Sequence, residues 1–197
     1  MSRRQQKKAE TRAAITEAAR KLFAKHGYAA TRTRDIAQAA GIATGTLFNY
    51  AKTKEDVVLM VWKARATALM ESGLAALAAE ADPVDGIVAL FRPIFGFYAE
   101  DLELGRVFLQ QAIYASPTDP EMVALNEGFI ARIALTLSPW AGLNAMHVSL
   151  NVFAAYHTVL TMLLGGRLDD RQAARMLRDL VRVQRKGWEE AVSSEGP

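Results

Sequence analysis

Residues 34 to 50 carry a group of short side chains that could contact nucleic acid. Small hydroxyl, amide and aromatic groups can approach base edges and phosphates closely, and a guanidinium can hydrogen-bond to guanine. The candidate residues are Arg34, Thr44, Gly45, Thr46, Asn49 and Tyr50. These residue types suit close approach to the base edges and phosphates of a nucleic acid.

Two short helices must position these side chains. Apolar spacing predicts them over about Thr33–Ala40 and Ala43–Ala51, separated by Gly41. A second short helix after a tight turn is the geometry that fits the DNA major groove. We expect the apolar hub between the helices to comprise Ile36, Ala37, Ala40, Ile42 and Leu47. Because other short helix pairs share this pattern, it leaves DNA binding and a purely structural role both open.

Charge is distributed unevenly along the chain. Residues 1–60 contain 12 Lys and Arg against 5 Asp and Glu, whereas residues 61–197 contain 12 against 16. A compact basic module on a mildly acidic body is typical of a nucleic-acid-binding domain joined to a regulatory or assembly domain. A solvated basic face is the alternative. The residues ahead of Ile15 include Arg3, Arg4, Lys7 and Lys8, which we interpret as a flexible basic arm that either contacts DNA or is solvated.

Catalytic and metal-binding patterns are weak in this sequence. The chain contains no cysteine, which excludes disulfides, thiolate catalysis and cysteine-type metal sites. His147 and His157 would lie about 80° apart on a helix, so they do not share a face for a metal ion. No nucleophile–base order or phosphate-binding glycine loop stands out. We therefore expect no metal, no cofactor and no enzymatic activity.

Composition predicts an all-α protein. The chain has 35 Ala and 21 Leu against 33 Val, Ile and Thr together, a balance that favours helix. The N-terminus has no signal-peptide pattern, so we expect a cytoplasmic protein. The uncharged stretch Ile133–Gly166 is long enough to span a bilayer, but Pro139, Gly142 and Asn144 interrupt it. We interpret it as a buried helix of a soluble protein.

Capping patterns predict where the helices begin and end. An amphipathic first helix should stop at Gly27, and Thr53 with Asp56 resembles a capping box that opens a helix reaching about Ala81. Further starts are predicted at Asp82-Pro83 and at Asp169 with Gln172. The expected architecture is about nine helices, with a helix-turn-helix module over residues 1–53 and a larger helical domain over residues 54–197.

Short strings in the first 60 residues form an ordered combination. They are Gly27-Tyr28, Thr31, Arg34-Asp35-Ile36-Ala37, Ala40-Gly41-Ile42, Gly45-Thr46-Leu47-Phe48-Asn49-Tyr50 and Lys54-Glu55-Asp56. This combination closely resembles the DNA-binding signature of TetR-type transcriptional regulators. The resemblance implies a homodimeric regulator, usually a repressor, whose C-terminal domain binds a small molecule and dimerises, and which binds a palindromic DNA operator.

The same resemblance implies roles for single residues. Arg34 and Thr44 would face bases and Gly45 would allow close approach, while Thr46, Tyr50 and Lys54 would hold phosphates. Three positions depart from the family pattern. Phe48 lacks a hydroxyl that usually reaches phosphate, Ala43 lacks the usual cap hydroxyl, and Arg32 stands where a hydroxyl often caps the preceding helix.

Aromatic residues mark a candidate effector site in the C-terminal part. Phe91, Phe95 and Tyr98 share one face of a helix that Pro93 should kink, which can hold a cavity open. A mainly aromatic lining with a few polar groups suits a mainly hydrophobic small molecule, although an aromatic stripe also occurs as ordinary core. We expect the remaining lining to come from Phe108, Gln111, Phe129, Phe153, Tyr156 and His157.

The helix predicted over Leu143–Leu164 is apolar on two faces. A helix of this kind must be covered on both sides, and a partner subunit could cover one of them. The candidate interface residues are Val148, Val152, Ala155, Val159 and Met162, with Leu177, Leu180, Val181 and Trp188 from the last helix. Burial within one monomer is the alternative. For the whole chain, the leading function is a ligand-controlled DNA-binding repressor, and the alternative is a helical small-molecule-binding protein without DNA-binding activity.

Overall fold

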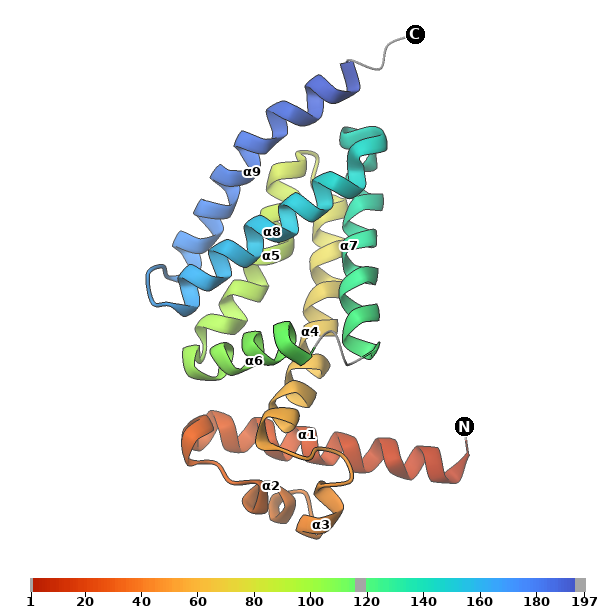
Figure 1. The fold of residues 1–197 in the computed structure, drawn as a ribbon, viewed down its shortest axis with the longest axis vertical. Helices are drawn as coiled ribbons and strands as arrows, with labels where there is room; N and C mark the ends of the chain where they lie inside the picture. The colour runs from red at the N-terminus through yellow and green to blue at the C-terminus, as the bar shows by residue number, and fades with distance from the viewer. Residues whose placement is uncertain (1, 116–119, 194–197) are drawn as a thin grey trace. The chain divides into compact units, whose positions relative to one another are not determined.

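Helices make up the regular structure of the described residues, as the composition predicts. The computed structural model describes residues 2–115 and 120–193, and no strand occurs within them. The helices shown in Figure 1 are α1 (Arg3–Ala30), α2 (Thr33–Ala39), α3 (Thr44–Leu47), α4 (Lys54–Ala79), α5 (Pro83–Ala99), α6 (Leu102–Ala115), α7 (Pro120–Ala141), the 3-10 turn η2 (Gly142–Asn144), α8 (Ala145–Leu164) and α9 (Asp170–Ser193). The predicted all-α fold class is therefore confirmed.

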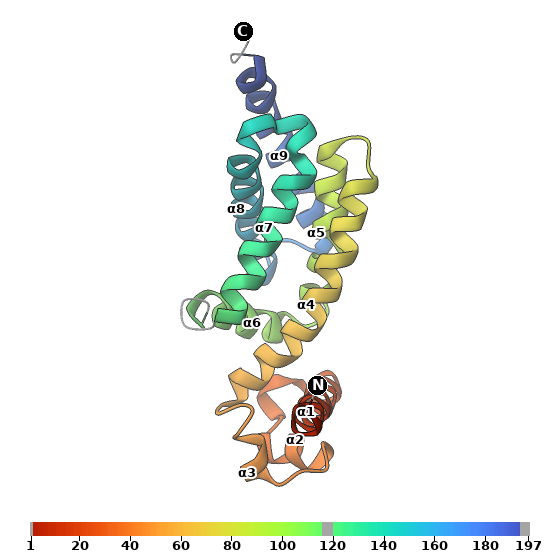
Figure 2. The same ribbon diagram turned by 90° about the vertical axis from the view of Figure 1, so that its right-hand side faces the viewer.

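Contacts divide the chain into two compact units, and the division falls inside α4. The first unit contains residues 1–66 and 103–115, so it holds α1 to α3, the beginning of α4 and most of α6. The second unit contains residues 67–102 and 116–197, which include the rest of α4, α5, α7, α8 and α9. Within the second unit, α8 packs against α5, α7 and α9, and Figure 2 shows α8 beside α7.

Helix α1 extends over residues that the sequence suggested as a flexible arm. It begins at Arg3, and Ser2 caps it in a capping box with Gln5. The Gln5 amide donates to Ser2 Oγ at 3.3 Å, and the Ser2 amide donates to Gln5 Oε1 at 2.8 Å. Arg3, Arg4, Lys7 and Lys8 are therefore exposed residues of α1, and the expectation of a flexible arm is wrong.

The predicted stop at Gly27 appears as a break inside α1. Gly27 has φ 78°, a left-handed conformation that a side chain disfavours, and the helix resumes to Ala30. Thr31 then secures the end of the helix, because its hydroxyl donates to the carbonyl oxygens of Gly27 at 2.8 Å and of Leu22 at 3.3 Å. The chain is thereby redirected into α2.

A small apolar hub holds the first three helices together. Ile36, Ala37 and Leu47 are at most 1% exposed, and they are buried together with Ile15 and Phe23 of α1. Gly41, with φ 69°, makes the turn between α2 and α3. The predicted hub is thus largely confirmed, although Ala40 and Ile42 remain partly exposed.

Predicted caps form at the starts of later helices. Thr53 and Asp56 make the reciprocal pair, with Asp56 N to Thr53 Oγ1 at 3.1 Å and Thr53 N to Asp56 Oδ2 at 3.0 Å. Asp169 and Gln172 do the same at the start of α9, at 2.7 and 2.9 Å. Asp82 caps α5 by accepting from the amides of Val84 and Asp85. Local sequence therefore determines these helix starts.

Glycine permits close packing of α4 on α5 in the second unit. A Cβ atom at Gly73 would lie 2.6 Å from Leu90 Cδ1 and 2.7 Å from the Leu90 carbonyl oxygen. A Cβ atom at Gly86 would lie 2.9 Å from the carbonyl oxygen of Leu77. The two helices approach so closely that neither glycine position has room for a side chain.

The long uncharged stretch is part of the folded core. Residues 121–164 pass the length and hydropathy test for a membrane span, but half of the most apolar window is buried in the protein. Pro139 and η2 also interrupt it. Val152, Val159, Leu160 and Leu163 of α8 are fully buried. These contacts agree with the prediction of a buried helix.

Candidate nucleic-acid interface

All eight residues that the sequence assigned to DNA contact lie at the surface of the first unit. Arg34, Gly45, Phe48 and Asn49 are exposed, and Thr44, Thr46, Tyr50 and Lys54 are half-buried. They lie on or beside α2 and α3, apart from Lys54 at the start of α4. Because the hub below is packed, the polar positions face outward.

Arg34 is available for a ligand. Among residues 2–115 and 120–193, the structure gives its guanidinium no hydrogen bond and no ion pair. Its five N–H donors are therefore free to pair with the two acceptors on a guanine edge. Phe48, which is 45% exposed, presents an apolar ring where a hydroxyl would offer a hydrogen bond.

Helices α2 and α3 begin without side-chain caps. Arg32 and Ala43 occupy the cap positions, and neither makes a cap hydrogen bond from its side chain. Both helices are instead closed by backbone bonds, such as the Thr46 amide to the Ala43 carbonyl oxygen at 2.9 Å. The departures seen in the sequence therefore remove caps while the backbone geometry is kept.

Lys54 makes internal contacts that the sequence did not indicate. Its ammonium donates to the carbonyl oxygens of Tyr28 at 2.9 Å and Thr31 at 3.2 Å, and lies 4.0 Å from the centre of the Tyr28 ring. These bonds join the first turn of α4 to the end of α1. An ammonium has three N–H donors, so one remains for a phosphate.

Tyr28 and Glu55 complete this junction. The Tyr28 hydroxyl donates to the Glu55 carboxylate. Burial raises the pKa of Tyr28 well above its usual value, and the hydrogen bond from Tyr28 lowers the pKa of Glu55. Both residues occur in the signature strings, yet their separation of 27 residues gave no sign of direct contact. The junction fixes the first turn of α4 relative to the end of α1 within the first unit.

The predicted effector residues of the second unit form one aromatic cluster. Phe91 stacks on Tyr156 with ring centres 4.4 Å apart, and Phe129 meets Phe91 and Phe153 edge-on at 6.1 and 6.3 Å. All seven rings of the cluster come from α5, α7 and α8, and Phe91 and Phe95 are fully buried. The cluster contains Phe91, Phe95, Tyr98, Phe129, Phe153, Tyr156 and His157. The rings fill this space themselves.

Two polar groups lie inside the cluster in their neutral forms. Burial raises the pKa of Tyr156 well above its usual value, and Tyr98 hydrogen-bonds to it. Burial also lowers the pKa of His157, whose ring lies 4.6 Å from that of Phe153. The remaining predicted residues, Phe108 and Gln111, lie on α6 in the first unit, where Phe108 is buried and Gln111 is partly exposed.

A groove between α4 and α7 reaches the cluster at Phe129. It has a volume of about 170 Å³ and is lined by Thr67, Met70, Glu71, Ala124, Leu125, Gly128, Phe129 and Arg132. Glu71 and Arg132 form a two-pronged ion pair across it, with Arg132 Nη2 to Glu71 Oε2 at 2.8 Å. The hydrogen bond lowers the pKa of Glu71. The sequence identified only Phe129 of this groove.

The structure corrects the face assigned to a partner subunit. Seven of the nine predicted interface residues are at most 8% exposed within one chain. They are Val148, Val152, Ala155, Val159, Leu177, Val181 and Trp188, whereas Leu180 is exposed and Met162 partly so. These seven side chains contact the chain's own core. Met146 and Leu150 of α8, Leu180 and Val183 of α9, and Leu143 of η2 are instead exposed to solvent, at 37–86%.

Comparisons with known proteins find matches to the helix-turn-helix module and to the helical fold. Residues 15–61 match the family model described as bacterial regulatory proteins, tetR family. Over 49 residues, the chain is 39% identical to the fatty acid metabolism regulator protein of Bacillus subtilis (strain 168). That match covers 25% of each chain, so it spans about a quarter of the curated relative's length.

Solved structures share the fold over most of the chain. A TetR regulator from Rhodococcus sp. RHA1 matches with a TM-score of 0.68 and 17% identity, covering 90% of this chain and 96% of that one. Thermus thermophilus FadR, a TetR-family repressor in complex with lauroyl-CoA, matches with a TM-score of 0.65 and 24% identity, covering 87% and 92%. The fatty acid degradation regulator FadR from Bacillus halodurans matches at 0.62 and 19%, covering 86% and 93%.

The matched segment begins in α1 and ends in α4, so it contains the apolar hub, the helix-turn-helix and the Tyr28–Lys54–Glu55 junction. The likeness over the remaining helices shows a common fold. Residues 15–61 therefore match the N-terminal module of the tetR family of bacterial regulatory proteins, and the remaining helices share the fold of solved TetR-family regulators.

Proposed function

We propose that this protein is a ligand-responsive transcriptional repressor that a small, mainly hydrophobic effector releases from a palindromic operator. The observation that carries the proposal is the exposed set of polar side chains on α2 and α3, mounted on a packed hub in a basic unit. Residues 1–53 would bind DNA and residues 54–197 would bind effector and dimerise. DNA as the partner favours a cytoplasmic protein, and the proposal assigns it no catalytic activity.

Each DNA-contacting residue has a role that its exposure supports. Arg34 and Thr44 would contact bases, with Gly45 allowing α3 to approach the groove closely. Thr46, Tyr50 and the third N–H of Lys54 would contact phosphates, and Asn49 is exposed beside them. Phosphate contacts set position on the duplex, and base contacts set the sequence that is chosen.

The effector would enter the second unit through the groove between α4 and α7. A volume of about 170 Å³ is small beside the ~300–1,000 Å³ of typical ligand sites, and the aromatic cluster beyond it is packed. Binding would therefore require the Glu71–Arg132 pair to open and the rings around Phe129 to move. A fatty acyl chain suits this apolar interior, and two relatives are fatty acid regulators.

Helix α4 offers the route from effector to DNA. It is one helix from Lys54 to Ala79, so it begins at the Tyr28–Lys54–Glu55 junction and lines the groove with Thr67, Met70 and Glu71. An effector that prefers an altered setting of α4 would alter the setting of the recognition helix. Reciprocity then requires operator DNA to weaken effector binding by the same factor.

A second copy of the chain would cover the exposed apolar face of α8 and α9. Two copies are needed because a palindromic operator presents two half-sites about 34 Å apart. Exposed leucine, methionine and valine side chains on two neighbouring helices are what a four-helix interface requires. In this proposal the interface is formed by exposed residues such as Leu150 and Leu180, in place of the buried residues, such as Val152 and Val159, that the sequence suggested.

The test is a DNA-binding titration with the full-length protein. We expect the protein to bind a palindromic DNA sequence from the region upstream of its own gene. Lauroyl-CoA, used as the probe effector, should weaken that binding. Titrating lauroyl-CoA with and without operator should give affinities that differ by ~5 to 150-fold. If the protein binds lauroyl-CoA but no DNA, it is a small-molecule-binding protein, the alternative that Phe48 and the uncapped Ala43 motivate.

A further inference from the structure

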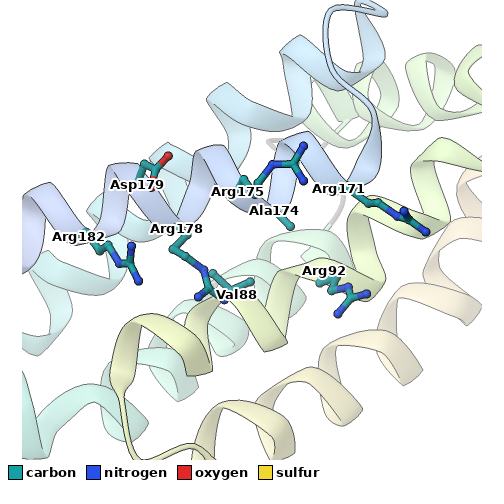
Figure 3. Close-up of a pocket in the computed structure, with 8 residues that line it drawn as sticks. All are labelled: Val88, Arg92, Arg171, Ala174, Arg175, Arg178, Asp179 and Arg182. Carbon is teal, nitrogen blue, oxygen red and sulfur yellow. The ribbon is translucent and has the colours of Figure 1, made fainter.

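Four arginines form a straight row on one face of α9. Arg171, Arg175, Arg178 and Arg182 follow one another at spacings of four, three and four residues, which place them within about 60° of one another around the helix. The row extends over about 16 Å along the helix axis. Figure 3 shows Arg178 and Arg182 directed from α9 toward α5, where Arg92 adds a fifth guanidinium.

These arginines line a groove between α5 and α9. The groove has a volume of about 550 Å³, within the ~300–1,000 Å³ range of small-molecule sites. Val88 and Ala174 contribute apolar groups to its lining, and both are largely buried. The site is separate from the groove between α4 and α7, because the two share no residue. It is concave, cationic and partly apolar.

The positive charge of the groove is mostly uncompensated. Arg178 pairs with Asp85 at 2.9 Å. For Arg92, Arg171, Arg175 and Arg182, the described part of the chain provides neither a hydrogen bond nor an ion pair. Asp179 is the one acidic residue of the lining, and Figure 3 shows it directed to the side of α9 away from α5. Like charges three and four residues apart destabilise a helix, so an anion bound here would relieve repulsion.

We propose that this groove binds a small molecule that carries two or more linked phosphate groups. A guanidinium has a planar fork of donors that matches phosphate oxygens, and neighbouring arginines can share one anion. A concave site with an apolar floor suits a compact ligand better than an extended polyanion such as duplex DNA. The flanking Asp85 and Asp179 carboxylates would also repel a polyanion that ran past the groove. The site is independent of the DNA-binding function.

Calorimetric titration of the full-length protein tests this proposal at constant ionic strength. The probes are pyrophosphate, ATP and coenzyme A, with sulfate as the reference anion. The double variant Arg171→Gln, Arg175→Gln should bind the phosphate probes at least about tenfold more weakly. Arg167→Gln, an exposed arginine outside the groove, removes the same kind of charge and should leave affinity within twofold of the parent.

A thermal melt gives a second readout that does not depend on measuring heat of binding. Without ligand at low salt, the double variant should melt at a higher temperature than the parent, because charge repulsion along α9 is reduced. Pyrophosphate should raise the Tm of the parent more than that of the variant. Circular dichroism of both proteins establishes that the variant is folded.

The probes also distinguish the source of the phosphates. Equal affinity for pyrophosphate and ATP would support the proposal with inorganic polyphosphate as the source, and tighter binding of ATP and coenzyme A would support it with a nucleotide. Two affinity results would overturn the proposal: sulfate binding as tightly as pyrophosphate, or equal phosphate affinity in the parent and the double variant. The proposal would also be overturned if the parent bound no phosphate probe and the double variant lost DNA binding.

Discussion

The two units of this protein present their candidate sites in opposite ways. In the first unit, the candidate DNA-contacting side chains are at the surface, and the small hub beneath them is closed. In the second unit, the candidate effector residues are the core itself, with Phe91 and Phe95 fully buried and stacked around Tyr156. A site for a rigid polymer can be preformed on a surface. A site for a hydrophobic effector inside a packed core must open before it can bind. Without ligand, the side chains that would line this site therefore pack against one another and stabilise the fold.

The largest difference should appear when one aromatic ring is removed from each unit. Phe91→Ala should lower the free energy of unfolding by about 3 to 5 kcal/mol, because it leaves a cavity in a packed cluster. Phe48→Ala, the matched control in the first unit, should change it by about 0.5 kcal/mol or less, because Phe48 is 45% exposed. Urea denaturation of both variants measures this. Equal effects would mean that the cluster is not closely packed.

Charge placed on α8 distinguishes its solvent-facing side from its core side. Leu150→Glu should convert the proposed dimer to monomers, because a carboxylate would be buried unpaired in the proposed interface. The monomer should remain folded, since Leu150 is 47% exposed in one chain. Sedimentation velocity measures the change. Leu135→Glu on α7, at a residue 74% exposed, is the control and should remain dimeric. A dimeric Leu150→Glu protein would exclude this face as the interface.

In the first unit, Arg34→Ala should weaken operator binding by about 1 to 3 kcal/mol and relax the preference for one base pair. The protein should keep its stability, because Arg34 is exposed and contacts no other described side chain through a hydrogen bond or ion pair. Lys186→Ala, an exposed cation on α9, is the charge-matched control. Fluorescence anisotropy with operator and mutated operators measures both effects. Unchanged discrimination would contradict the assignment of Arg34 to a base.

A smaller and opposite effect is expected at the start of α3. Ala43→Ser should stabilise the first unit by about 1 kcal/mol, because the serine hydroxyl can accept from an amide in the first turn that no side chain now caps. Ala39→Ser, an exposed position at the end of α2, is the control and should give no gain. Hydrogen exchange of the first unit measures the change. No slowing of exchange in Ala43→Ser would mean that the cap position is already satisfied.

The smallest effect concerns pH and the aromatic cluster. Burial lowers the pKa of His157 below its usual 6.5, so the folded state prefers the neutral ring. Between pH 6.5 and the lower pKa of the folded state, the unfolded chain therefore binds more protons than the folded chain. The contribution of His157 to the free energy of unfolding is present above pH 6.5 and is lost as the pH falls through the folded-state pKa. His157→Phe should reduce this loss, whereas His147→Phe, an exposed position, should not. Urea midpoints between pH 5 and 7.5 measure the difference. An identical pH profile in parent and His157→Phe would exclude this role.

The sequence determined those features that depend on neighbouring residues. The capping pairs Thr53–Asp56 and Asp169–Gln172 form as predicted, and Gly27 and Gly41, which the sequence placed at breaks between helices, have positive φ. The exposure of the candidate DNA contacts also follows from local spacing, because Ile36, Ala37 and Leu47 are turned into one small hub. Hydrogen bonds over three or four residues and the period of a helix are enough to produce these results.

Only the tertiary structure decided which of two apolar faces is buried. The sequence gives α8 apolar residues on both sides, and the packing of α5, α7 and α9 determines that Val152 and Val159 are core while Leu150 is exposed. The same is true of the Lys54 contacts with the end of α1 and of the groove that brings Arg92 to the arginines of α9. These features join segments far apart in the chain, and no local pattern specifies which distant helix covers a given face.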